Sequence, residues 1–116
     1  MEKEDIIIKF MGFTPSEFTN SYIRRMIHEI FEEAPYGATL SATFSRADNT
    51  YKGMINIASS AGPFFGFALG ENIHEVGRKL ENQIHRRLMK WKSKRFRNST
   101  LTDKKSATNF IYERER

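Results

Sequence analysis

The residues with the clearest capacity for chemistry are basic, and they crowd together late in the chain. Positions 86 to 97 hold no acid and seven cations: Arg86, Arg87, Lys90, Lys92, Lys94, Arg95 and Arg97. Cationic groups on consecutive helical turns can contact successive phosphates of a nucleic acid, and arginine can also bind phosphate through two donors or stack on bases. The alternative is a solvated helix face that only aids solubility.

The net charge of +5 is unevenly distributed over the 116 residues. Residues 1–60 carry six lysines and arginines against eight acids, a net of −2, whereas residues 61–116 carry thirteen against six, a net of +7. This asymmetry favours a polyanionic partner, either nucleic acid or an acidic membrane surface. No apolar run approaches the roughly 20 residues that cross a bilayer. The acidic start, MEKED, is unlike a signal peptide and the chain has no cysteine, so we expect a cytoplasmic protein.

Residues that could support catalysis or bind a metal are not arranged to do so. The chain has three histidines: His28, His74 and His85. None of them lies at metal-ligand spacing from another, and no glycine-rich loop joins a strand to a helix in the form that cradles phosphate. The carboxylates of Glu29, Glu32 and Glu33 resemble a solvated rim rather than an acid–base pair. We therefore expect no enzymatic activity, metal, cofactor or small-molecule substrate.

The basic cluster belongs to a predicted helix, from Asn72 to Arg97, that also carries an apolar stripe. The stripe residues recur at spacings of three or four: Ile73, Val76, Leu80, Ile84, Leu88 and Trp91. They share one face of the helix, and Asn72 with Glu75 forms the pattern of an N-terminal cap. One side should therefore pack in the core while the other presents cations. If an earlier helix lies alongside, its Arg24 and Arg25 would extend the same surface into a two-helix basic platform.

Four strands and one helix are predicted upstream. Alternating apolar residues mark strands at about residues 5–11, 38–45, 51–57 and 64–69. A helix should begin at Thr14, with Pro15 in its first position and Glu17 completing a capping box. Its expected apolar face comprises Phe18, Tyr22, Ile23, Met26, Ile27, Ile30 and Phe31.

The resulting order, β-α-β-β-β-α, predicts an α+β fold class. The first two strands, joined through a helix, should be parallel neighbours, and the next two should add as antiparallel hairpins. Because each helix has one apolar stripe, we predict a two-layer sandwich with two helices on one face of a four-stranded mixed sheet. This domain should span residues 1–97, be monomeric when free, and precede a disordered tail at residues 98–116.

Three features together resemble a known family: this element order, the turn centred on Gly62, and the sequence of the last helix. The matching helix segments are Lys79-Leu80-Glu81, Arg86-Arg87-Leu88 and Lys90-Trp91-Lys92-Ser93-Lys94-Arg95. The pattern is similar to that of the ribosome hibernation family, which comprises short hibernation-promoting factors and protein Y, also called sigma-54 modulation proteins. The similarity covers about residues 5–97, and residues 107–113 resemble the tail of the protein Y branch.

The resemblance implies a translation inhibitor that binds the small ribosomal subunit and its 16S rRNA in the mRNA and tRNA channel. Such a protein would preserve idle ribosomes in stationary phase or under stress. The residues that match rRNA-facing positions of the family are Arg24, Arg25, Arg78, Lys79, Arg86, Lys90, Lys94 and Arg95. The chain departs from the family at Glu71-Asn72-Ile73-His74, where many members have an acidic residue followed by Asp-Met-Tyr. The alternatives are a protein-interaction module that modulates another factor, or a general binder of structured RNA.

Overall fold

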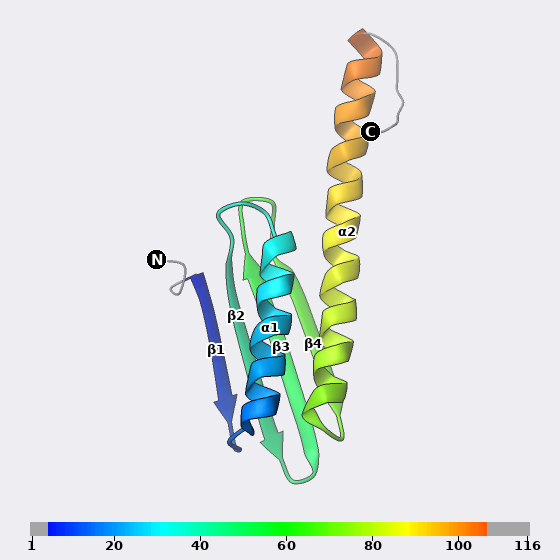
Figure 1. The fold of residues 1–116 in the computed structure, drawn as a ribbon. Coiled ribbons are helices and arrows are strands. Elements are labelled where there is room, and N and C mark those ends of the chain that lie inside the picture. Colours follow the sequence, from blue (N-terminus) through cyan, green and yellow to red (C-terminus); the bar gives the residue numbers. More distant parts are fainter. Residues whose placement is uncertain (1–4, 107–116) are drawn as a thin grey trace. The chain divides into compact units, whose positions relative to one another are not determined.

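The structure is a computed structural model that describes the backbone of residues 5–106 and the side chains of residues 5–94. It comprises two compact units, residues 1–85 and residues 86–116, which are described separately below. The elements follow the predicted order (Figure 1). They are β1 (Ile6–Met11), α1 (Glu17–Glu33), β2 (Thr39–Ala47), β3 (Thr50–Ala58), β4 (Phe64–Gly70) and α2 (Ile73–Ser106).

The four strands form one mixed sheet in the order β1-β2-β3-β4. β1 and β2 are parallel, with Ile8 opposite Ala42, whereas the β2–β3 and β3–β4 pairs are antiparallel. Only Asp48 and Asn49 separate β2 from β3, and Asp48 adopts a positive φ of 58°, which Asp and Asn tolerate in tight hairpin turns. The predicted α+β class and four-stranded mixed sheet are confirmed.

α1 and the first turns of α2 cover the same face of the sheet (Figure 1). The fully buried side chains between the layers come from both helices and the two central strands, β2 and β3: Ile23, Ile27, Leu40, Phe44, Ile55, Ile57, Val76, Leu80 and Ile84. Their burial supplies the main stabilisation, at about 1.5–3 kcal/mol for each large aliphatic or aromatic side chain. The predicted arrangement of two helices on one face is therefore confirmed.

Glycines set how closely the first turns of α2 approach the strands. A Cβ atom placed on Gly53 of β3 would lie 2.7 Å from side-chain carbons of both Leu80 and Val76. One placed on Gly66 of β4 would lie 3.1 Å from the side chain of Ile84. Because neither position has room for a side chain, the helix backbone can pack directly over these two strands.

The apolar faces follow the predicted periodicity with one exception. On α2 the residues Ile73, Val76, Leu80, Ile84 and Leu88 are buried and Trp91 is half-buried. On α1 the prediction is wrong for Phe18, whose side chain is 75% exposed. At 3.6 residues per turn, Phe18 points roughly 130° away from the centre of the buried stripe, so it lies outside the core.

Two predicted helix boundaries are wrong. α1 is capped by Ser16 rather than Thr14, because the Ser16 hydroxyl accepts a hydrogen bond from the Thr19 amide at 3.1 Å. α2 continues past Arg97 to Ser106, and no glycine or proline follows Gly77 to end it earlier. The division into a domain at 1–97 and a disordered tail at 98–116 stays a prediction, and residues 107–116 lie outside the described part.

Candidate nucleic-acid interface

α1 and the first turns of α2 run side by side in the same direction. Three contacts occur in the same order along both helices: the His74 ring meets Tyr22, Gly77 lies against Tyr22 and Ile23, and His85 pairs with Glu33. Residues on matching turns therefore face each other along the line where the helices pack, which is called the groove here and is hollowed into a pocket at its far end. The character of this groove changes from its start to its end.

An aromatic stack forms the start of the groove. The His74 ring lies between Phe18 and Tyr22, with centroid distances of 5.6 Å and 4.7 Å. Its Nε2 atom is hydrogen-bonded to the Thr19 hydroxyl at 3.1 Å. Thus His74, which departs from the family pattern, is held as a spacer between two aromatic rings of α1.

The first predicted site residues lie at and just beyond this stack. Arg25 and Arg78 are exposed, and both are close enough to Tyr22 to oppose the upward shift of its pKa. That shift is caused mainly by burial of the phenol and next by the carboxylate of Glu81. Arg25 on α1 and Arg78 on α2 therefore both lie near Tyr22, and their role in RNA binding stays a prediction.

The other two predicted cations of the first unit are engaged by neighbours. Arg24 donates from Nε to the Asn20 side-chain oxygen at 2.6 Å, which holds its guanidinium against the outer surface of α1. Lys79 donates from Nζ to the Leu69 carbonyl at 2.9 Å and lies 3.2 Å from a Glu75 carboxylate oxygen. Lys79 is thus tied to the end of β4, and its charge is partly balanced.

A reciprocal cap fixes the start of α2. The Asn72 side-chain oxygen accepts from the Glu75 amide at 2.8 Å, and a Glu75 carboxylate oxygen accepts from the Glu71 amide at 3.0 Å. The hydrogen bond from Glu71, followed by that from Lys79, lowers the pKa of Glu75 below its ordinary value of 4.5. The capping pattern predicted from Asn72 and Glu75 is confirmed, and it anchors the turn that presents Arg78.

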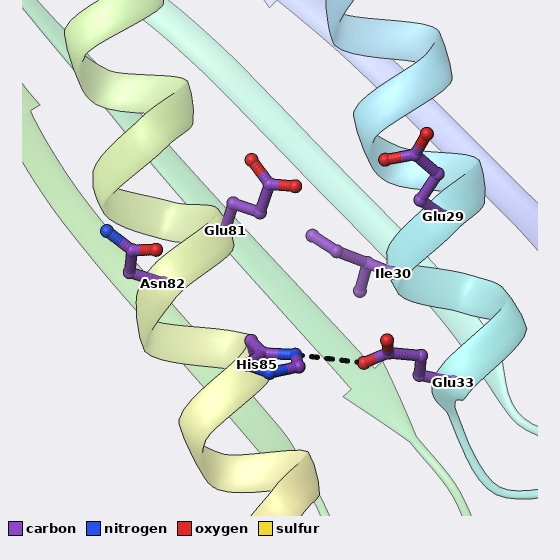
Figure 2. Close-up of a pocket in the computed structure, with 6 residues that line it drawn as sticks. All are labelled: Glu29, Ile30, Glu33, Glu81, Asn82 and His85. Carbon is purple, nitrogen blue, oxygen red and sulfur yellow. Dashed lines mark hydrogen bonds and ion pairs between the residues drawn. The ribbon is translucent and has the colours of Figure 1, made fainter.

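The far end of the groove is acidic. A pocket of about 310 Å³ is lined by Glu29, Ile30, Glu33, Glu81, Asn82 and His85 (Figure 2). His85 Nδ1 lies 3.1 Å from a Glu33 carboxylate oxygen, which links the end of α1 to α2. Among residues 5–94 no three acidic, histidine or cysteine side chains are placed to hold a metal ion. The two-helix basic surface is therefore confined to the turn of Arg25 and Arg78.

The predicted row in the second unit lies on consecutive turns of α2. Arg86, Lys90 and Lys94 are all exposed, and their spacing of four places them along one face of the helix. At 1.5 Å rise per residue this row presents one positive charge about every 6 Å. The backbone of Arg95 belongs to α2, but its side chain lies outside the described residues.

Two features of the first unit escaped the sequence analysis. Glu81 and His85 lie one turn apart on α2, as do Glu29 and Glu33 on α1, and this matched spacing is a signal for a shared acidic groove. Gln83 also went unnoticed. Its side-chain amide accepts from the Phe67 amide at 3.0 Å and donates to the Phe67 carbonyl at 2.8 Å, which closes the outer edge of β4. No local pattern marks such a glutamine, because its partner is sixteen residues away.

Two solved structures are similar to this chain. A ribosomal subunit interface protein from Coxiella burnetii matches with a TM-score of 0.64 and 14% identity, over 76% of this chain and 97% of its own. The N-terminal domain of protein Y from Thermus thermophilus matches with a TM-score of 0.53 and 11% identity, over 75% of this chain and 96% of its own. The chain has their fold. No protein-family model and no curated protein sequence matches it. The two similar structures confirm the resemblance drawn from sequence at the level of the fold.

No helix in the described part of the chain is both long enough and apolar enough to span a bilayer.

Proposed function

We propose that this protein associates with the ribosome in the cytoplasm, binds the small subunit through 16S rRNA, and inhibits translation by occupying the mRNA and tRNA channel. The exposed row of Arg86, Lys90 and Lys94 carries the proposal. The fold supports it, because one similar structure is named a ribosomal subunit interface protein and the other is the N-terminal domain of protein Y. Preservation of idle ribosomes under stress or in stationary phase is the biological role that fits such binding.

The physical basis is recognition of an RNA backbone rather than of a base sequence. The major groove of an RNA helix is too narrow for side chains to read its bases, so a row of cations on one helix face contacts phosphates. Each such contact releases condensed counterions, which makes the affinity fall steeply as salt is added. Arg25 and Arg78 supply a second, shorter cationic site in the first unit.

Sedimentation of the protein with purified ribosomal subunits tests the proposal. The wild-type protein should travel with 30S and 70S particles at low salt and dissociate as the salt concentration rises. Combined substitution of Arg86, Lys90 and Lys94 by Glu should abolish this co-sedimentation. Absence of the wild-type protein from both particles at low salt would sink the proposal.

A matched pair of single variants locates the surface. Lys90→Glu and Lys92→Glu change the net charge equally on the same helix, but the two side chains point to nearly opposite sides, about 160° apart. Only Lys90→Glu should weaken ribosome binding, with circular dichroism confirming that both variants remain folded. Equal loss in the two variants would mean that net charge, and not the row, drives association. Binding that is insensitive to salt would favour a protein partner instead.

A further inference from the structure

The sheet face opposite α1 carries an exposed aromatic pair that the proposed function does not use. On β4 the side chains alternate, with Phe64, Gly66 and Ala68 buried and the bulkier residues outside. Phe65 is 49% exposed and Phe67 is 42% exposed. An exposed aromatic pair on one face of one strand is costly in water, which points to a ligand.

The rest of this face combines the exposed apolar residues Ile7, Met11, Met54 and Leu69 with two lysines and with the uncharged polar residues Ser41, Thr43, Ser45 and Asn56. Lys9, Thr43, Met54 and Phe67 lie directly opposite one another across the four strands. In the adjacent row, Lys52 is paired with Leu69 on β4. None of the described strand residues on this face is acidic. Two aromatic rings, two ammonium groups and a strip of hydroxyls therefore share one surface.

The edge of β4 is closed to a peptide strand at the position of these rings. Gln83 occupies both the amide and the carbonyl of Phe67, and Lys79 occupies the carbonyl of Leu69. A partner strand would need those same backbone groups, so recognition by strand addition is blocked there. The same bonds hold the β4 backbone from which the Phe67 ring projects. A ligand must therefore bind the face and not the edge.

The spacing of the two rings fits nucleobases. Residues two apart on a strand lie about 6.6–6.8 Å apart, roughly twice the rise per base in a stacked nucleic-acid strand. Bases splayed from a single strand can stack on such rings, whereas bases inside a duplex cannot reach them. The segment Phe65-Gly66-Phe67 also matches the aromatic-Gly-aromatic centre of the motif with which a common four-stranded RNA-binding sheet stacks bases.

We propose that the open face of the sheet is a binding site for single-stranded RNA, in which Phe65 and Phe67 stack on two bases while Lys9 and Lys52 contact phosphates. This site does not rest on the proposed ribosome function, because it uses other elements and another form of RNA. Gly66 fits the role as well: a Cβ atom there would lie only 3.1 Å from the Ile84 side chain and 3.3 Å from that of Gln83, so glycine lets the strand that carries both rings pack closely under α2.

Fluorescence anisotropy with a labelled ten-nucleotide single-stranded RNA of mixed sequence tests the site. The background protein carries Arg86→Glu, Lys90→Glu and Lys94→Glu, so that the row on α2 does not contribute. This protein should bind the single strand more tightly than a duplex of the same sequence. Replacing Phe65 and Phe67 together by Thr, which retains strand propensity, should weaken binding at least about tenfold.

Two controls separate base stacking from nonspecific binding to an apolar surface. Leu69→Thr removes a side chain of similar exposure, 48%, from the same strand and face but removes no ring. Its affinity should stay within about twofold of the background protein, and Phe67→Tyr should retain binding because it preserves the ring. An equal loss in Leu69→Thr would make the face a general apolar surface suited to protein and would overturn the proposal. So would an absence of single-strand binding in the background protein, or undiminished binding by the double Thr variant with an unchanged circular dichroism spectrum.

Discussion

The two ends of the groove between α1 and α2 are built from the same two helices but have opposite character. At the start, the stacked rings of Phe18, His74 and Tyr22 are followed by the cations Arg25 and Arg78. About one turn further on, carboxylates from both helices converge in one pocket (Figure 2). Because the two helices run parallel, residues on matching turns lie opposite each other. Two ordinary amphipathic sequences therefore form a groove whose charge changes from positive to negative along its length.

Under the proposed function, this polarity would limit how RNA approaches the first unit. Phosphates are attracted to the start of the groove and repelled from its end, so the groove favours one orientation of a bound backbone. A uniformly basic groove would bind more tightly but would allow the RNA to slide along it. Under the proposed function, we expect the carboxylates to act as a boundary that sets where a bound backbone lies on the cationic site.

Forcing the helices apart should have the largest effect, because it disrupts both ends of the groove at once. A Cβ atom at Gly77 would already lie 3.0 Å from the Tyr22 ring, and Gly77→Leu adds three more carbons to this contact. Overpacking of this kind costs about 1–3 kcal/mol of unfolding free energy. Urea denaturation followed by circular dichroism measures the loss. Ser21→Leu, at an exposed position of α1, should change stability by less than about 0.5 kcal/mol, and an equal cost there would contradict the close helix approach.

Reversing the charges at the basic end should have the next largest effect, this time on RNA binding. Arg25→Glu together with Arg78→Glu replaces two phosphate contacts with two repulsions. The slope of log affinity against log salt should then become less steep by about 2, and the affinity for ribosomal subunits at low salt should fall. Filter binding over a range of salt concentrations provides both values. An unchanged slope would show that this end of the groove does not contact phosphate.

Neutralising the acidic end should have a smaller and opposite effect. Glu29→Gln with Glu81→Gln removes two negative charges from the groove, which should raise RNA affinity a few-fold and make the salt dependence steeper. Glu17→Gln with Glu32→Gln, both exposed on α1, makes the same change in net charge outside the pocket. If both pairs raise the affinity equally, the pocket carboxylates do not act as a local boundary.

The elements and the core of the fold could be predicted because their signals are local. Alternation in the strands and the stripe from Ile73 to Leu88 depend only on which residues lie on one face, and burial follows those patterns closely. The exposure of Phe18 was not predicted, because an apolar residue type does not by itself show whether the side chain faces the core. Its actual partner, His74, is 56 residues away.

The candidate site was only partly predictable, for a similar reason. Arg25 and Arg78 could each be singled out from the sequence, but their common position near Tyr22 depends on the parallel alignment of two helices, which the sequence does not specify. Lys79 matched the family pattern but is tied to the β4 carbonyl of Leu69. Gln83, with no functional signature, closes the edge of the same strand. Contacts between a helix and a strand edge arise from tertiary packing, which local periodicity does not encode.

The smallest predicted effect concerns the cap that supports the basic end of the groove. The hydrogen bond from the Glu71 amide lowers the pKa of Glu75 in the folded protein. The ionised carboxylate therefore stabilises the fold fully at pH values above 4.5, the ordinary pKa of this group. This contribution should disappear as the pH falls through the lower, folded-state pKa. The difference in unfolding free energy between wild type and Glu75→Gln should therefore shrink from pH 5.5 to pH 3, measured by urea titration at each pH. Lys79→Gln keeps the dominant bond from Glu71, so it should retain most of this pH dependence. If the pH dependence disappears completely in Lys79→Gln, the lysine and not the hydrogen bond from Glu71 is the main cause of the lowered pKa of Glu75.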